Sequence, residues 1–331
     1  MEPERLNRDL KALAMVKVVM VRYSMDLLSK KNVFELLKTP HSLESISMSC
    51  GLKHAKMLEN MLDLLVGEGI LSFDGKGYSV KNLKITDTTE AKRYLSEGYK
   101  ESLEWIDFVN RFSESTLTTG KASELTGFEE EKAIYYWNKI MEQGPHSLRV
   151  IAITELYKDM KPGALVMDYG CGGGVGLEQL LEMSNKPVRL IATDPSTRFF
   201  QEAKRRAKAL SFSDPVRNQN KKDIVFEGFG GIDKYIGKLD GIFISIIFNH
   251  IEEMEHVRIF RMLRSLLKPG GKLVIVQLMD FGKHNRNPIW VMHNIPTHRG
   301  YPMRERFVRD LRSVFGSVEE RLDGMVTIST K

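Results

Sequence analysis

The chain has 331 residues, of which 42% are hydrophobic and 28% are charged, and a formal net charge of +6. This composition excludes an intrinsically disordered chain, and the length is enough for two domains. Two cysteines far apart in sequence, Cys50 and Cys171, exclude a disulfide framework and a zinc-ligand spacing, so we expect reduced thiols in a cytoplasmic protein. The longest apolar run, residues 242–248, is far below the about 20 residues of a membrane helix, which predicts no membrane span.

Residues 1–85 have the pattern of helices followed by a hairpin. Apolar positions at helical spacing predict helices within 10–20, 33–37, 43–48 and 53–66, and a turn at 74–75 joins strands at 69–73 and 77–80. This order is typical of a winged helix, which either binds DNA or serves in packing and dimerisation. Glu59 and Asp63 balance the lysines of the helix 53–66, and this charge balance favours dimerisation over DNA binding.

Residues 86–160 predict a helical linker that is rich in aromatic side chains, among them Trp137. Aromatic residues at helical spacing usually form core. Pockets also favour the junction of two domains, so this linker is expected to contribute to a substrate pocket.

Residues 161–331 alternate between strands and helices. Strands are expected at 164–167, 188–192, 224–226, 241–246 and 272–276, helices at 177–183, 199–210 and 254–267, and a terminal hairpin at 317–320 and 325–330. Regular alternation of this kind predicts an α/β fold with a doubly wound parallel sheet.

A glycine-rich loop, Asp168-Tyr169-Gly170-Cys171-Gly172-Gly173-Gly174, follows the first of these strands and precedes a helix. Ligands of doubly wound sheets bind outside the carboxyl ends of the strands, and glycines let the backbone approach a ligand closely. A loop of this kind is also used by dinucleotide enzymes, so it does not identify the ligand by itself.

Three features favour S-adenosylmethionine as the ligand. Asp168 at the head of the loop would repel a pyrophosphate but suits a cationic sulfonium with its amino group. Asp194 ends the next strand and can accept hydrogen bonds from both ribose hydroxyls. A turn at residues 268–271, Lys-Pro-Gly-Gly, precedes the fifth strand and is frequent in methyltransferases.

These motifs resemble those of class I S-adenosylmethionine-dependent methyltransferases. Over nearly its full length the chain is similar to the winged-helix small-molecule O-methyltransferases, a group that includes acetylserotonin, plant phenolic and bacterial polyketide methyltransferases. The linker residues 135–141 and residues 259–271 carry the resemblance within that group. The resemblance implies a Rossmann-like seven-stranded methyltransferase sheet in residues 161–331 and an intertwined homodimer through an N-terminal winged-helix dimerisation domain. It also implies that Trp137 and Met141 face cofactor or substrate.

The cofactor site expected from the loop and the resemblance has ten residues. They are Asp168, Gly170, Cys171, Gly172, Gly174, Asp194, Pro195, Gly228, Phe229 and Ser245. The family places an acid and a methionine after the third strand to hold the adenine, but this chain has Glu227-Gly228-Phe229 there. Phe229 either stacks on the adenine or packs under the loop, and Asp223 and Glu227 are the alternative acids.

The catalytic base is the second departure from the family. An ungapped match places Asn249 at the position of the family's histidine, with His250 one residue later. His250 is then either the general base or a structural histidine that fixes the strand end. His293 or His298 is an alternative base.

Residues 281–306 follow the fifth strand and are expected over the pocket. They hold Trp290 and several basic residues, among them Lys283, His284, Arg286 and His293. We interpret them either as a basic rim that attracts an anionic substrate or as a solvated loop with Trp290 packed beneath it. Their histidines lack the spacing of metal ligands, so no metal is expected.

The function indicated by these patterns is methyl transfer from S-adenosylmethionine to a small, possibly anionic or aromatic molecule, at a hydroxyl or phenolate oxygen. One alternative is transfer to carbon or nitrogen, or an altered reaction at the same cofactor site. An alternative of another class is a winged-helix regulator that binds DNA and senses S-adenosylmethionine. The balanced charge on residues 53–68 disfavours nucleic acid as a partner.

Overall fold

The computed structural model describes residues 3–127, 130–210, 213–282 and 289–331. The chain divides into two compact units, which we call the helical unit and the sheet unit. The helical unit comprises Glu2–Gly144 and Asp280–Gly300, and the sheet unit comprises Pro145–Met279 and Tyr301–Lys331. The segment after the last parallel strand therefore belongs to the helical unit, although the sequence places it beside the sheet.

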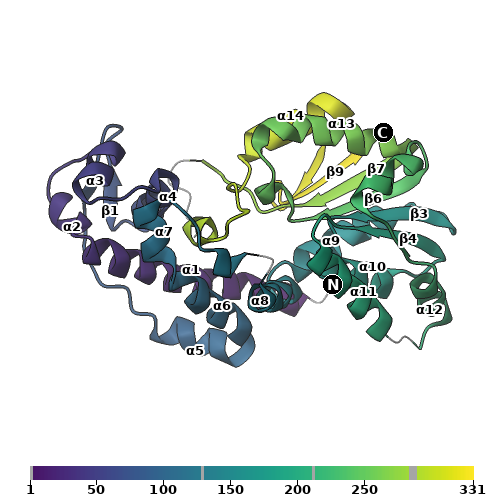
Figure 1. Cartoon of the computed structure of the whole chain (residues 1–331), viewed down its shortest axis with the longest axis horizontal. Helices are drawn as coiled ribbons and strands as arrows, with labels where there is room; N and C mark the ends of the chain where they lie inside the picture. Colours follow the sequence, from purple (N-terminus) through teal and green to yellow (C-terminus); the bar gives the residue numbers. More distant parts are fainter. Residues whose placement is uncertain (1–2, 128–129, 211–212, 283–288) are drawn as a thin grey trace. The chain divides into compact units, whose positions relative to one another are not determined.

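The helical unit is made of helices and one small hairpin (Figure 1). Its elements are α1 (Pro3–Lys30), α2 (Val33–Leu36), α3 (Leu43–Ser49), α4 (Ala55–Gly67), β1 (Leu71–Phe73), β2 (Tyr78–Val80), α5 (Thr89–Gly98), α6 (Lys100–Asn110), α7 (Ser113–Thr119), η1 (Glu124–Thr126), α8 (Glu131–Glu142) and η5 (Ile289–Asn294). The order of helices and hairpin that the sequence predicts for residues 1–85 is thus present, with the two strands antiparallel.

Helix α4 is a packing element of the helical unit. Its apolar face, which includes Met57, Leu58 and Met61, is fully buried. Its charged residues are engaged within the unit: the Tyr78 hydroxyl donates to Asp63 at 3.0 Å, and Lys56 pairs with Glu59 at 2.9 Å. Most of the surface of this helix, the candidate DNA-recognition helix of the sequence, is therefore buried in the core of the helical unit.

The sheet unit contains one seven-stranded sheet in the described part of the chain. Its strands are β3 (Ala164–Tyr169), β4 (Val188–Thr193), β5 (Val225–Phe226), β6 (Leu239–Ser245), β7 (Leu267–Val276), β8 (Glu319–Arg321) and β9 (Val326–Thr330). Their order is β5-β4-β3-β6-β7-β9-β8, with β9 antiparallel to both neighbours and the other pairs parallel. The mixed α/β fold with a mainly parallel sheet, predicted from the alternation of strands and helices, is confirmed.

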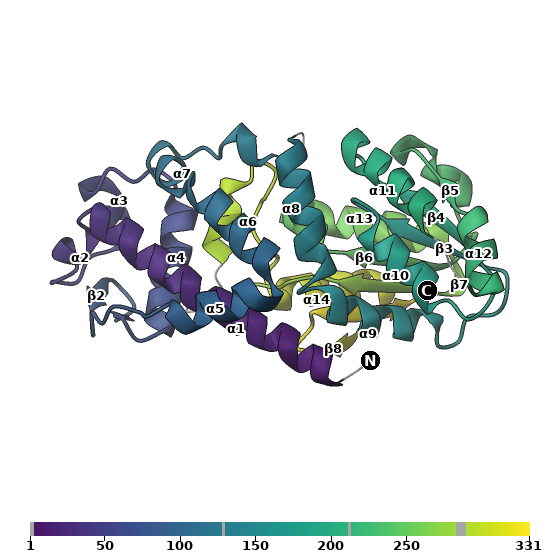
Figure 2. The same ribbon diagram turned by 90° about the horizontal axis from the view of Figure 1, so that it is seen from below.

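Helices cover both faces of this sheet. The elements are α9 (His146–Tyr157), α10 (Val175–Met183), α11 (Thr197–Ala209), α12 (Pro215–Lys222), α13 (His256–Leu266) and α14 (Arg304–Phe315), with the short turns η2 (Phe229–Tyr235), η3 (Phe248–His250) and η4 (Glu253–Glu255). Helices α13 and α14 lie on one face, and α9, α10 and α11 lie on the other, as the two views show (Figures 1 and 2). A sheet buried on both faces explains why its strands are continuous apolar runs.

One hydrophobic core cluster of the sheet unit lies between the sheet and α13–α14. Buried side chains of β6 and β7, such as Ile242 and Ile275, pack there with Phe260 and Phe307 from the two helices. This packing fixes β3, β6 and their carboxyl ends as a rigid frame for the loops that follow them.

Two local features differ from the sequence prediction. Strand β7 begins at Leu267, because residues 268–271, expected as a turn, continue the strand, with Gly270 at φ +79°. Helix α12 was not predicted, since its eight residues are almost all polar. The signal was the Asp214-Pro215 pair: Asp214 caps the helix by accepting from the Arg217 N–H, and proline stands at the first turn.

Among the residues described, no helix combines the length and apolar character that crossing a membrane requires.

Candidate active site

Four of the buried side-chain atoms without a hydrogen-bond partner lie at the carboxyl ends of the central strands. They are Asp168 Oδ2 at the end of β3, Thr193 Oγ1 at the end of β4, Ser245 Oγ at the end of β6 and Asn249 Nδ2 just beyond it. Burying a polar group without a partner is costly, and such groups are rare in folded proteins. Strand order reverses between β3 and β6, the point where doubly wound sheets bind ligands, so these atoms are candidates for contacts to a ligand.

The glycine loop is fastened to the end of β4. The N–H groups of Gly170 and Cys171 both donate to the Thr193 carbonyl, at 2.8 and 2.9 Å. Gly170 has φ +76°, and a Cβ there would lie 2.7 Å from Ile247 Cγ2. Only glycine satisfies both the left-handed backbone and the close approach. The Cys171 thiol is buried, which raises its pKa well above the usual value and keeps it protonated and inert at neutral pH.

Two further glycines bring α10 close under the loop. A Cβ on Gly174, where φ is +86°, would lie 3.0 Å from Ala203 Cα of α11. A Cβ on Gly176 would lie 3.1 Å from the Phe243 ring and 3.4 Å from Asp168 Oδ2. The carboxylate of Asp168 therefore lies directly over the first turn of α10.

Asp168 is the most perturbed carboxylate of the site. It is 1% exposed, and burial first, then the nearby Asp194, raise its pKa to about 7, against the lowering effect of the Arg149 charge. A carboxylate in this state gains from a cationic ligand, because the ligand supplies the counter-charge that the protein leaves incomplete.

Asp194 is half-buried at the end of β4 and is oriented by two backbone groups. Its Oδ2 accepts from the Gly172 N–H and its Oδ1 from the Ser196 N–H, both at 2.8 Å. Burial raises the pKa of Asp194, while these two hydrogen bonds lower it. Each carboxylate oxygen keeps a second lone pair, so a diol can bind beside the exposed Pro195.

The position expected to hold a nucleobase is bordered by Phe229. Its ring is partly buried against Tyr169, with centroids 5.0 Å apart, and Gly228 beside it is exposed. Glu227, an alternative acid, donates its N–H to the Ala192 carbonyl at 3.0 Å and pairs with Lys234. Phe229 thus contacts the end of β3 through Tyr169, and both interpretations of its role stay predictions. Asp223, the other alternative acid, is the exposed residue that ends α12.

The turn after β6 separates Asn249 from His250. Ile246 has φ +56°, a rare value for a β-branched residue, and turns the chain into η3. Asn249 is fully buried, and its Oδ1 accepts from Gln277 Nε2 at 3.4 Å, while Gln277 Oε1 accepts from the Phe248 N–H at 3.0 Å. His250 is partly exposed and its N–H donates to a backbone carbonyl. The one-residue offset therefore places a buried amide and a more accessible imidazole side by side.

His293 lies in the helical unit and is held there by neighbours. Its Nε2 lies 2.8 Å from Asn60 Oδ1, and its ring contacts His54 and His298, with centroids 4.9 and 5.9 Å apart. Burial first, then the charges of His54 and Lys56, lower the pKa of His293 to about 3. Such a group is a weak base at neutral pH, so this geometry does not favour His293 as the general base.

The residues of α8 and η5 that were expected to contact the substrate also belong to the helical unit. Trp290 is fully buried, and its indole Nε1 has no hydrogen-bond partner. Met141 is nearly buried, and Trp137 is partly exposed on α8. Lys283, His284 and Arg286 of the expected basic rim lie outside the described residues. In the described part of the chain, no three histidine, cysteine or acidic side chains are placed to hold a metal ion.

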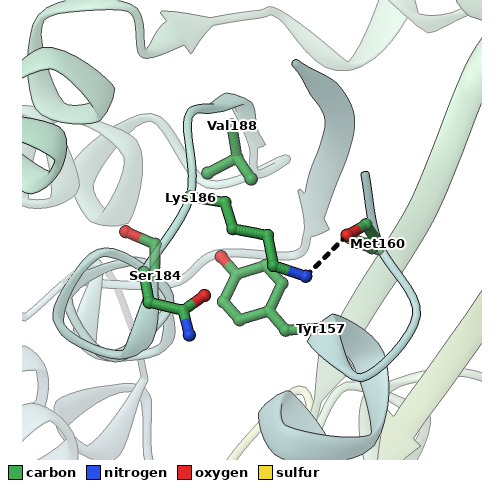
Figure 3. A pocket seen from close by; sticks show the side chains of 6 residues that line it. Tyr157, Met160, Ser184, Lys186 and Val188 are labelled. Atoms are coloured by element: carbon green, nitrogen blue, oxygen red, sulfur yellow. Dashed lines mark hydrogen bonds between the residues drawn. The ribbon is translucent and has the colours of Figure 1, made fainter. Parts of the chain in front are cut away.

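A small hollow lies at the opposite, amino-terminal edge of the sheet, where β4 begins at Val188 (Figure 3). Its polar groups are engaged: Lys186 Nζ donates to the Met160 carbonyl, and the Tyr157 hydroxyl donates to the Leu180 carbonyl, both at 2.9 Å. This hollow has neither the unpartnered atoms nor the glycine loop of the carboxyl edge.

The sequence prediction did not include Arg149, Thr193 or Gln277. Thr193 immediately precedes Asp194 at a strand end, and Gln277 immediately follows β7, so a rule that counts every polar residue at a parallel strand end would have found both. Arg149 gave no such signal, because it lies in the first turn of helix α9 and not at a strand end.

Comparison with known proteins places this site in a methyltransferase domain. Residues 167–273 match the family described as methyltransferase domain. A squalestatin tetraketide synthase of Phoma sp. (strain C2932) is 29% identical over 157 residues, 45% of this chain and 6% of that protein. A ubiquinone biosynthesis O-methyltransferase of Xanthomonas axonopodis pv. citri (strain 306) is 28% identical over 159 residues, 46% of this chain and 57% of that protein. The chain thus matches less than two thirds of the length of either relative.

Solved structures with the same fold cover almost the whole chain. The CurJ carbon methyltransferase has a TM-score of 0.71 at 14% identity, over 98% of this chain and 93% of that one. The DszA carbon methyltransferase has a TM-score of 0.69 at 12% sequence identity, over 100% of this chain and 94% of that one. An O-methyltransferase family 2 protein from Planctomyces limnophilus DSM 3776, in complex with apigenin, has a TM-score of 0.56 at 10% sequence identity, over 98% of this chain and 94% of that one. The residues that match the methyltransferase domain, 167–273, lie within the sheet of order β5-β4-β3-β6-β7-β9-β8.

Proposed function

We propose, from the methyltransferase domain in residues 167–273, that this protein transfers a methyl group from S-adenosylmethionine to a small-molecule acceptor. The observation that carries the proposal is the set of unpartnered buried atoms at the carboxyl ends of β3, β4 and β6, next to the glycine loop. The bound donor supplies a methyl group activated by its sulfonium, so the protein needs mainly to align the acceptor with it.

In this proposal, different residues of the sheet unit bind different chemical groups of the donor. Asp168, with an unpartnered oxygen and a raised pKa, suits the cationic end of the donor. Asp194 is pre-oriented by the N–H groups of Gly172 and Ser196 to accept hydrogen bonds from a ribose diol. Gly170, Cys171 and Gly174, as loop backbone, and Ser245, as an unpartnered hydroxyl, complete the surroundings, with Phe229 and Gly228 at the nucleobase end.

Asn249 and His250 follow β6, where the acceptor would approach the methyl group. In this proposal Asn249 Nδ2, buried and unpartnered, donates a hydrogen bond to an acceptor oxygen, and Gln277 fixes its orientation. His250 removes the acceptor proton. In a buried site the hydrogen bond from Asn249 stabilises the oxyanion left by this proton transfer more than it would in water, and the negative charge is neutralised when the methyl group is transferred.

Two classes of methyl acceptor are compatible with this proposal. The sequence favours a hydroxyl or phenolate oxygen. Transfer to an activated carbon is favoured by the carbon methyltransferases among the structural neighbours, whose TM-scores of 0.71 and 0.69 exceed the 0.56 of the O-methyltransferase solved with apigenin. The Asn249 donor suits both classes, because an enolate, like a phenolate, carries its charge on oxygen.

The experiment incubates the protein with an isotope-labelled methyl donor and two acceptor panels, one of phenols and one of β-dicarbonyl compounds. The chemical shift of the labelled methyl group then tells an O-methyl from a C-methyl product. Transfer to one panel that requires Asp194 supports the proposal and assigns the acceptor atom. Absence of transfer, together with absence of donor binding, contradicts it.

The proposed assembly is a homodimer through residues 1–85. What supports it is exposed apolar surface on α1, where Leu10 is 52% and Leu13 is 47% exposed. The domain boundaries 1–85, 86–160 and 161–331, the winged-helix role of the first and the pocket role of Trp137, Met141, Trp290 and His293 belong to the same proposal. Light scattering during size exclusion tests the dimer: a monomer mass at micromolar concentration would contradict it.

A further inference from the structure

The positive charge of the chain is concentrated in one segment of the sheet unit. Residues 197–222 contain eight lysines and arginines against two acidic residues, a net charge of +6. This equals the formal net charge of the whole chain, so the remaining residues are neutral overall. The segment forms helices α11 and α12, and we call their exposed side the α11–α12 surface (Figure 1). A net charge gathered in one segment creates a local positive potential, whereas the same charge spread over a chain of this length does not.

The two acidic residues of this segment are already engaged, while most of its cations are not ion-paired. Glu202 pairs with Arg205 at 2.6 Å, and Asp214 caps α12 by accepting from the Arg217 N–H at 3.0 Å. For five cations the described residues offer no carboxylate partner: Lys204, Lys208, Arg217, Lys221 and Lys222. The surface therefore carries positive charge that the described part of the chain leaves uncompensated.

Two of these cations are held in place by groups without a full counter-charge. Lys204 Nζ lies 4.4 Å from the centroid of the Phe200 ring and 5.8 Å from that of Phe226. Lys221 Nζ donates to two backbone carbonyls at the carboxyl end of α11, one of them that of Lys208 at 3.1 Å. Aromatic faces and the carboxyl ends of helices stabilise a cation but leave it able to bind an anion. This order reduces the entropy that a flexible lysine loses when it binds a partner.

Helix α11 is also attached to the glycine loop. Arg206 Nε donates to the Gly173 carbonyl at 3.1 Å, and its Nη1 pairs with Glu178 of α10 at 2.8 Å. The close approach of Gly174 to Ala203 joins the same loop and helix. A partner bound to α11 therefore contacts an element that packs directly on the glycine loop.

We propose that the α11–α12 surface docks an acidic helix of a partner protein. Lys204 and Lys208 are four residues apart in α11, as are Arg217 and Lys221 in α12, so each pair is spaced by about one helical turn. Carboxylates one turn apart on a partner helix have the matching spacing. Complementary charge of this kind speeds the encounter of two proteins and orients them. The inference goes beyond the proposed methyl transfer and does not depend on it.

A nucleic acid is the other polyanion that such a surface attracts. Proteins that bind single strands present aromatic rings on which bases stack. Here Phe199 is buried, and Phe200 and Phe226 are partly buried beneath Lys204, so these rings are not presented for stacking. The surface therefore favours an acidic protein.

The test measures the binding of two labelled anionic probes by fluorescence anisotropy. One probe is an alanine-rich helical peptide with glutamates four residues apart, and the other is a single-stranded oligothymidylate of equal charge. The wild type is expected to bind the peptide more tightly than the oligonucleotide, with an affinity that falls as salt is added. Lys208→Glu combined with Lys222→Glu reverses two exposed cations of the surface and is expected to weaken peptide binding at least about tenfold.

The control combines Lys158→Glu with Lys161→Glu, the same charge change at two exposed lysines between α9 and β3. It is expected to leave the peptide affinity within about twofold of the wild type. Equal weakening by the two double variants would show that the total charge of the chain binds the peptide, and would overturn the inference. Equal or tighter binding of the oligonucleotide by the wild type, or no binding of the peptide, would overturn it as well.

A second pair of substitutions keeps the test decisive if the glutamate variant does not melt cooperatively. Lys208→Gln combined with Lys222→Gln removes the two charges without reversing them. It is expected to weaken the peptide by about two- to fivefold, because each exposed charge pair contributes little by itself. An unchanged peptide affinity in this folded variant would contradict docking on the α11–α12 surface.

Discussion

Replacing Asp168 with asparagine is expected to make the protein more stable and its donor site weaker. The carboxylate is completely buried, one of its oxygens has no hydrogen-bond partner, and burial and Asp194 raise its pKa from 3.8 to about 7. An acid whose pKa is raised in the folded state costs stability once it ionises, because the unfolded state ionises at lower pH.

The magnitude follows from the pKa shift. A shift from 3.8 to about 7 corresponds to about 4 kcal/mol at 1.36 kcal/mol per pKa unit. This stability is present below the unfolded pKa of 3.8 and is lost as the pH rises through about 7. The neutral amide introduced by Asp168→Asn carries no ionisation cost, but burying it without partners costs about 1 to 3 kcal/mol. The free energy of unfolding at pH 8 is therefore expected to rise by about 1 to 3 kcal/mol in Asp168→Asn.

Urea unfolding at several pH values between about 5 and 8 measures this directly. The difference between variant and wild type is expected to grow with pH, while affinity for S-adenosylmethionine falls at least about tenfold because the ammonium loses its charged partner. Asp159→Asn is the control: Lys272 holds the pKa of Asp159 below its usual range, so the stability difference stays flat over this pH range. A less stable Asp168→Asn protein at pH 8, or a difference independent of pH, would refute the reasoning.

Three further substitutions test separate parts of the site. Gly170→Ala places a Cβ 2.7 Å from Ile247 at φ +76° and is expected to lower the free energy of unfolding by about 1 to 3 kcal/mol in thermal melts. Gly172→Ala has open space around the new Cβ and is expected to lower it less. Equal losses of stability in the two variants would contradict the close approach of Gly170 to Ile247. Asp194→Ala is expected to weaken the donor roughly 10- to 100-fold in titration calorimetry, and an unchanged affinity would remove its ribose role. Asn249→Leu is expected to lower kcat roughly 100-fold with an unchanged donor Kd in steady-state assays, and an unchanged kcat would exclude it as an oxygen ligand.

Much of the sheet unit could be predicted because its signals are local. Apolar runs of strand length alternate with helical patterns, and Asp168 and Asp194 stand at strand ends in the sequence itself. Parallel strands bring their carboxyl ends to one edge, so the position of both acids follows from the fold class. Helix α12 escaped prediction because polar residues give no hydrophobic period, although its cap signal was present.

The parts of the site that could not be predicted depend on tertiary packing. Arg149 and Gln179 lie in different helices and are 30 residues apart in sequence, and nothing in the pattern of α9 announces their contact. The hydrogen bond that Asn249 Oδ1 accepts likewise comes from Gln277, at the end of a neighbouring strand that is distant in sequence. The grouping of residues 280–300 with the helical unit reflects contacts with α4 and α7, such as the hydrogen bond from Asn294 to Ser113 at 2.9 Å.

Titration of the wild-type protein with S-adenosylmethionine and with S-adenosylhomocysteine tests whether the carboxyl edge of the sheet binds a methyl donor. Both ligands are expected to bind, each at one site per chain, and Asp194→Ala is expected to weaken both to a similar extent because both carry the same ribose. Absence of binding by either ligand to folded wild-type protein would contradict the assignment of the carboxyl edge of β3, β4 and β6 as a methyl-donor site.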